Sequence, residues 1–178
     1  MTWEEVKNAT YDVTPYTSYS IISLEELFSQ LTNHKDFKFS LDIKLYPAIE
    51  NQNEYHEKFT DALIALYDKY DLANHAYIES QNKDFLAMLH AKKSNYSLYH
   101  YSSSFQESFT AAKELGIKGI VISNKYITAD EIAIAHSEGI FVTLWDVRSK
   151  SENREAARKN PDMIETDKVD YLIKLLEQ

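Results

Sequence analysis

Two side chains of opposite charge stand two residues apart in an alternating part of the sequence. Asp42 and Lys44 fall within residues 37–45, where apolar and polar side chains alternate, and alternate residues of a strand point to the same side. Together they could hold a divalent cation and a phosphate oxygen, because carboxylate oxygens suit hard cations such as Mg²⁺ or Ca²⁺. The other interpretation is a solvated strand acid in an ion pair of little energetic consequence.

Two further residues lie at the ends of predicted strands. Glu79 ends a strand predicted at 76–79, and Trp145 ends one predicted at 140–145. Active sites of α/β barrels are built from the carboxyl ends of strands, so these residues could add a carboxylate and an aromatic wall to such a site. The alternatives are an exposed strand-end acid and an aromatic residue of the core or rim.

The six His residues show no metal-ligand spacing. His100 alternates with Tyr99 and Tyr101 and could point into a barrel, but a structural His is the preferred interpretation. The absence of Cys excludes disulfides, thiolate zinc sites and a Cys nucleophile.

Strand and helix patterns alternate regularly along the chain. The predicted helices cover 24–32, 52–70, 82–92, 105–115, 128–138, 150–159 and 168–177, and the predicted strands 37–45, 76–79, 96–101, 119–122, 140–145 and 163–166. Ser23 with Glu26, and Thr128 with Glu131, have capping-box spacing, and Gly116 suits the end of a helix. This order predicts βαβ units and a parallel sheet, either an open doubly wound one or part of a barrel. No Gly-rich phosphate loop is present, so nucleotide binding is not supported.

Composition narrows the classes of function. A length of 178 residues is typical of one domain. The chain has 19 basic and 28 acidic residues and a net charge of −9, which argues against a general binder of nucleic acid. There is no apolar run long enough to span a membrane and no signal-peptide pattern. We therefore predict a cytoplasmic protein.

Three stretches, in this order, resemble glycerophosphodiester phosphodiesterases. SLEEL (23–27) before LDIK (41–44) is similar to the family's TLEE helix and E-I-K strand, GIFVTLWDV (139–147) to its G-x-x-V-x-x-W-T-V strand, and PDMIETD (161–167) to its V-D-G-I-I-T-D strand. The resemblance covers about residues 20–178 and implies an incomplete (β/α) TIM-barrel-like fold. About six βα units are expected, with the first two strands missing. We expect an N-terminal extension or cover at 1–22 and the barrel domain at 23–178.

The resemblance implies metal-assisted hydrolysis of a small-molecule glycerophosphodiester, which releases glycerol 3-phosphate. Asp42 stands where the family has a Glu ligand of a divalent metal (Mg²⁺ or Ca²⁺). Lys44 matches the Lys that acts at the phosphate, and is the expected catalytic residue. Trp145 is expected to bind substrate on its glycerol side, with Glu79 as a further substrate-binding residue.

The sequence departs from the family pattern in one respect. The family's His-Arg-Gly segment, Glu-x-Asp strand and second His have no counterpart here. We therefore expect the isolated chain to be weakly active or inactive, and the alternative is a non-catalytic barrel remnant that binds a ligand or partner. Six strands leave open sheet edges, so we expect a homo-oligomer, a partner chain or residues 1–22 to cover them.

Overall fold

The computed structural model describes residues 2–9, 20–45 and 52–177. The chain divides into two compact units, Met1–Phe37 and Lys38–Gln178. Residues 1 and 10–19 of the predicted extension at 1–22 lie outside the described residues, and the boundary after residue 22 stays a prediction.

The first unit contains short helices. They are α1 (Trp3–Lys7), α2 (Leu24–Gln30) and the 3₁₀ helix η2 (His34–Asp36). The predicted capping box of α2 is confirmed, because the backbone N–H groups of Glu26 and Ser23 donate to each other's side chains, both at 3.0 Å. Phe28 is the buried residue of α2.

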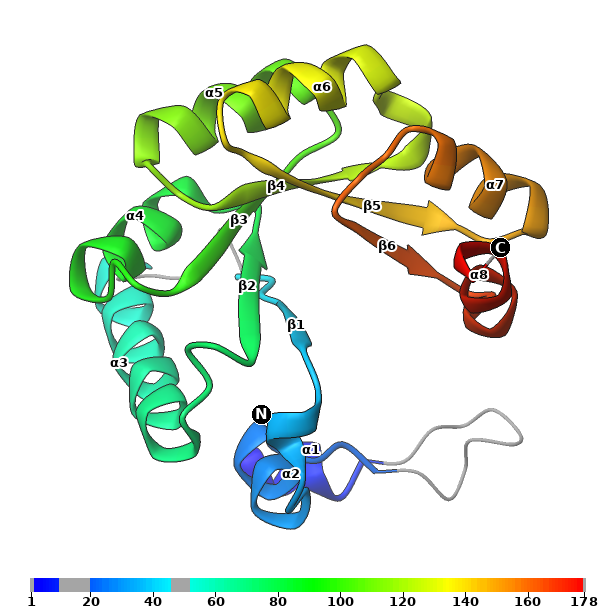
Figure 1. Cartoon of the computed structure of the whole chain (residues 1–178). Helices are drawn as coiled ribbons and strands as arrows, with labels where there is room; N and C mark the ends of the chain where they lie inside the picture. Colours follow the sequence, from blue (N-terminus) through cyan, green and yellow to red (C-terminus); the bar gives the residue numbers. More distant parts are fainter. Residues whose placement is uncertain (1, 10–19, 46–51, 178) are drawn as a thin grey trace. The chain divides into compact units, whose positions relative to one another are not determined.

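Six parallel strands form the sheet of the second unit, in the order β1-β2-β3-β4-β5-β6 (Figure 1). The strands are β1 (Phe39–Asp42), β2 (Ala76–Ser80), β3 (Ser97–Tyr101), β4 (Gly119–Ser123), β5 (Phe141–Val147) and β6 (Met163–Thr166). The helices are α3 (Gln52–Tyr70), α4 (Lys83–Lys92), α5 (Phe105–Leu115), α6 (Ala129–Ser137), α7 (Lys150–Arg158) and α8 (Val169–Leu176), and the 3₁₀ helix η3 (Asn124–Tyr126) follows β4.

This topology is an incomplete α/β barrel. Each strand pairs with the next in the sequence, whereas a doubly wound sheet reverses its strand order. The sheet curls into a half-barrel with the helices along its outer face (Figure 1), which confirms the predicted fold. Strands β1 and β6 are the edges of the described sheet, and the expected cover of these edges stays a prediction.

The two faces of the sheet differ in chemistry. Most side chains that face the helices are apolar and buried, among them Ile78, Leu98, Ile120 and Leu144. Burial of such side chains is the main favourable term in folding. Alternation then turns their neighbours toward the inside of the half-barrel. Of the helices described, none has both the length and the apolar composition that crossing a membrane requires.

Most predicted boundaries match the structure to within two residues, but the first strand does not. β1 covers Phe39–Asp42 instead of 37–45. At its start the N–H of Phe37 closes η2 by donating to His34 O at 3.2 Å, so the chain is still turning there. Lys44 therefore lies just past the strand, although the Ile43 N–H still donates to Glu79 O at 2.8 Å. Helix α1 and the two 3₁₀ helices were missed.

The structure favours glycine at positions 116 and 119 for different physical reasons. Gly116 ends α5 with φ 64°, as predicted, and a Cβ there would meet open space. Gly119, at the start of β4, has ordinary φ but lies under the ring of Tyr99. A Cβ at Gly119 would lie 2.5 Å from both the Phe141 carbonyl oxygen and Tyr99 Cε1. The packing of the Tyr99 ring against β4 therefore depends on this glycine.

We predict that Gly119→Ala lowers the free energy of unfolding by about 2 kcal/mol, because backbone and a packed ring must move to admit the methyl group. The matched control is Gly116→Ala, which carries only the cost of a left-handed backbone, about 1 kcal/mol. Urea denaturation of both variants measures the difference. An equal or smaller loss at Gly119 would contradict the packing described.

Candidate active site

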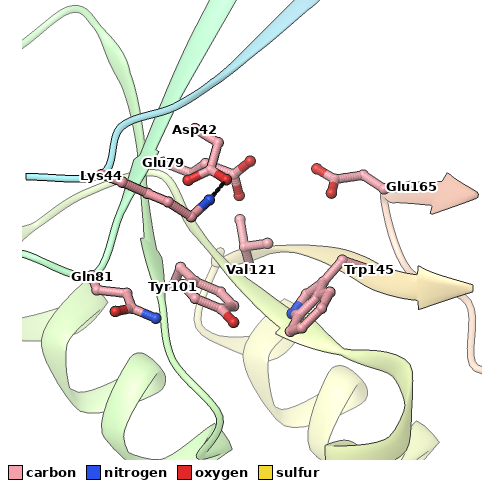
Figure 2. A pocket seen from close by; sticks show the side chains of 8 residues that line it. All are labelled: Asp42, Lys44, Glu79, Gln81, Tyr101, Val121, Trp145 and Glu165. Atoms are coloured by element: carbon pink, nitrogen blue, oxygen red, sulfur yellow. Dashed lines mark hydrogen bonds and ion pairs between the residues drawn. The ribbon is translucent and has the colours of Figure 1, made fainter. Parts of the chain in front are cut away.

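A pocket of about 290 Å³ lies at the carboxyl ends of the strands (Figure 2). Its lining residues come from all six strands or the turns that follow them: Asp42, Lys44, Glu79, Gln81, Tyr101, Val121, Trp145 and Glu165. The four residues singled out from the sequence, Asp42, Lys44, Glu79 and Trp145, all lie in it. This end of the sheet is where barrel enzymes carry their active sites.

Asp42 and Lys44 lie side by side at one edge of the pocket. The Lys44 ammonium donates to Asp42 Oδ2 (Figure 2). Both side chains are largely open to solvent, at 47% for Asp42 and 76% for Lys44. The hydrogen bond to Asp42 raises the pKa of Lys44, so the ammonium is charged at neutral pH. The structure therefore shows the ion pair of the other interpretation, and its solvent exposure leaves both groups reachable by a ligand; the metal-binding and phosphate-binding roles stay predictions.

Glu79 is buried, with only 6% of its surface exposed. The alternative interpretation of an exposed strand-end acid is therefore wrong. Parallel register places it directly opposite Asp42, and one of its oxygens accepts a hydrogen bond from Ser40 Oγ at 2.9 Å. Burial, and then the charge of Glu165, raises the pKa of Glu79 to about 7. Its carboxyl group can thus change protonation near neutral pH.

Trp145 forms the aromatic wall with Tyr101, at an edge-to-face centroid distance of 5.5 Å. The next residue, Asp146, has φ 62° at an irregularity in the β5–β6 pairing. Its carboxylate contacts Lys125 Nζ at 2.9 Å and Arg148 Nε at 2.6 Å. These two ion pairs lie at the irregularity of β5 that directly follows Trp145.

Tyr101 and Glu165 are pocket residues that the sequence interpretation did not select. Glu165, on β6, lies across the pocket from Lys44 (Figure 2), and Tyr77 donates to its Oε1 at 3.4 Å. Burial is the main cause that raises the pKa of Glu165. The sequence did carry a signal for Glu165. It is an acidic residue inside the short strand β6, at a position whose side chain faces the inside of the half-barrel.

His100 faces away from the pocket. It is 1% exposed, and its Nδ1 lies 3.2 Å from Ser108 Oγ on α5. Burial lowers the pKa of His100, so the ring is neutral at physiological pH. The preferred interpretation of a structural His agrees with this position between sheet and helix.

The pocket offers part of what a divalent metal ion requires. Asp42, Glu79 and Glu165 offer the oxygen donors that Mg²⁺ and Ca²⁺ prefer. However, the described residues contain no group of three or more His, Asp or Glu side chains placed to hold a metal ion, and Asp42 is engaged by Lys44. The described side chains therefore fit part of a ligand set, with Asp42 as its most accessible member.

The sequence matches a known family almost from end to end. A profile of the Glycerophosphoryl diester phosphodiesterase family matches residues 1–171. No curated protein matches the chain.

Solved structures share the fold. A candidate glycerophosphodiester phosphodiesterase from Galdieria sulphuraria superimposes with a TM-score of 0.81 at 22% identity, over 100% of this chain and 71% of that one. A glycerophosphodiester phosphodiesterase from Parabacteroides distasonis gives 0.82 at 18% identity, over 99% and 71%. An Oleispira antarctica phosphodiesterase in complex with its product sn-glycerol-3-phosphate gives 0.75 at 13% identity, over 92% and 64%. This chain thus spans about two-thirds of the length of these structures.

The fold and pocket define an α/β barrel-type protein with a polar site at the carboxyl ends of its strands. The match over nearly the whole sequence then assigns it: the chain belongs to the glycerophosphoryl diester phosphodiesterase family.

We predict that Glu79→Gln raises the free energy of unfolding by about 3 kcal/mol at pH 8. A carboxyl group whose pKa is raised from 4.5 to about 7 in the folded state contributes stability below the unfolded pKa and loses it as pH rises through 7. The amide avoids this loss and can still accept from Ser40. At pH 4 the two proteins should have nearly equal stability.

Denaturant titrations at pH 4 and pH 8 check this pH dependence. Glu114→Gln, an exposed carboxylate on α5, is the matched control and should change nothing at either pH. If Glu79→Gln raised the free energy of unfolding equally at pH 4 and pH 8, burial of this carboxylate would not set its pKa.

Proposed function

We propose that this chain binds a glycerophosphodiester in the pocket at the strand ends and supports slow, metal-assisted hydrolysis to glycerol 3-phosphate. The observation that carries the proposal is the convergence in one pocket of four residues that the sequence had singled out in three separate segments: Asp42, Lys44, Glu79 and Trp145. Membership of the family supports the same substrate class, as does the product bound to the Oleispira antarctica structure.

The residues can be given roles in binding. The Lys44 ammonium is the pocket's cation for the phosphodiester oxygens, because it is charged and open to solvent. Trp145 and Tyr101 provide an apolar wall for the carbon skeleton of the substrate. Asp42 is the candidate ligand of Mg²⁺ or Ca²⁺, which when bound would polarise the phosphodiester.

Hydrolysis adds the oxygen of water to phosphorus and breaks the bond to the headgroup oxygen. The water must lose a proton and the departing alcohol must gain one. Glu79 can hold or give a proton at neutral pH because its pKa is about 7, and general acid–base groups act best near the working pH. No His lines the pocket as described, and one carboxyl group serves both proton transfers poorly, which supports a slow reaction.

The second candidate is a non-catalytic module that binds the same ligand or a partner. The partial metal-ligand set favours it. Acid–base and metal contributions each supply large factors of rate, so a site with a partial set would keep affinity while losing turnover.

We predict slow release of glycerol 3-phosphate from glycerophosphocholine in the presence of Mg²⁺ or Ca²⁺, and its loss on chelation of the metal. Asp42→Ala should abolish it, whereas Asp61→Ala, which removes an exposed carboxylate on α3 outside the pocket, should leave it unchanged. Enzyme-coupled detection of glycerol 3-phosphate measures both.

The outcomes separate the two candidates. If glycerophosphocholine binds but neither the wild type nor any variant hydrolyses it, the chain is a binding module and not a hydrolase. Turnover that survives Asp42→Ala would show that the reaction does not use this pocket as described.

A further inference from the structure

The pocket carries more negative than positive charge. Three of its lining side chains are carboxylates, Asp42, Glu79 and Glu165, and one is an ammonium, Lys44. Lys44 pairs with Asp42. Within the described chain, the hydrogen-bond partners of Glu79 and Glu165 are hydroxyl groups, those of Ser40 and Tyr77. Glu165, across the pocket from Lys44, therefore has no cation as a hydrogen-bond partner among the described residues.

A phosphodiester whose only charge is negative matches the charge of the pocket only at Lys44. Its phosphate can approach Lys44 beside β1, whereas Glu165 lies on β6 at the opposite edge of the sheet, so a substrate group that reaches across the pocket meets a carboxyl group. Like charges brought into a partly buried site repel strongly. A substrate with a positive group at the other end would complement both sides at once.

The wall next to Glu165 suits a cation of a particular kind. Trp145 and Tyr101 meet edge to face at 5.5 Å, and Trp145 and Glu165 lie on the same side of the pocket (Figure 2). Aromatic faces attract ammonium groups, Trp most strongly, and quaternary ammonium ligands are recognised in this way. A carboxylate beside the ring adds a direct charge interaction.

We propose that the pocket selects glycerophosphodiesters by the charge of their headgroup, with Glu165 and the Trp145 ring binding a cationic ammonium headgroup. This inference rests on the proposed function and adds its specificity. It assigns Trp145 to the headgroup side of the substrate, whereas the family resemblance placed it on the glycerol side. Glu165 is then the residue that distinguishes choline and ethanolamine headgroups from neutral ones.

The test compares dissociation constants by isothermal titration calorimetry in buffer with Mg²⁺. The probes are glycerophosphocholine, glycerophosphoethanolamine and glycerophosphoglycerol, whose headgroup is neutral. The wild type should bind the two cationic-headgroup compounds about tenfold more tightly than glycerophosphoglycerol, as one partly buried charge interaction predicts. Glu165→Gln should weaken the first two about tenfold and leave glycerophosphoglycerol nearly unchanged.

Controls and opposing outcomes follow from the same measurements. Glu114→Gln, an exposed carboxylate on α5 outside the pocket, should change no dissociation constant, and circular dichroism checks that Glu165→Gln is folded. Equal weakening of all three compounds would assign Glu165 to the shared glycerol half and overturn the inference while leaving the proposed function standing. Equal wild-type affinities would do the same. Absence of binding for all three would overturn the proposed function as well.

Discussion

Parallel pairing of neighbouring strands is the constraint on which the site depends. Each strand pairs with the next in sequence, so all six carboxyl ends meet at one end of the sheet. Register then decides the neighbours: Asp42 is opposite Glu79, Tyr101 opposite Val121, and Ser123 opposite Trp145. Residues from six segments that are distant in sequence thereby share one pocket.

The same pairing explains the chemistry of the interior. Alternation sends apolar residues such as Ile78 and Leu98 to the helix side and leaves Glu79 and Glu165 to face inward. Their carboxyl groups are buried by the curled sheet rather than by an apolar core, and burial is the first cause of the raised pKa of each. A site that holds carboxylates in this way is suited to a cation, whether it is a metal ion or part of the ligand.

Much of the fold could be predicted from local sequence. Capping boxes at Ser23 and Thr128 and the αL glycine at 116 marked helix ends that the structure confirms, and short alternating or apolar runs between the helical patterns marked the strands. The limits of β1 were wrong because the 3₁₀ turn that ends at Phe37 depends on hydrogen bonds that alternation does not reveal. The parallel order of six strands followed from helix spacing, and the family resemblance then favoured a barrel over an open sheet.

The site was predicted in part. Asp42, Lys44, Glu79 and Trp145 lie together as expected, because each stands at or near a strand end. The burial of Glu79 was not foreseen, since it results from neighbouring strands rather than from its own segment. Glu165 was missed for a similar reason: its hydrogen-bond partner, Tyr77, is 88 residues away, and nothing local shows that the two meet.

The most direct test of the account is whether a glycerophosphodiester reaches Trp145. The chain has two Trp residues, so the indole region of a ¹H–¹⁵N NMR spectrum is simple, and Trp145→Phe assigns the signal. On titration with glycerophosphocholine, we predict a saturable shift of the Trp145 indole resonance that Lys44→Met weakens. An indole signal that does not move at saturating ligand would contradict the placement of the substrate in this pocket.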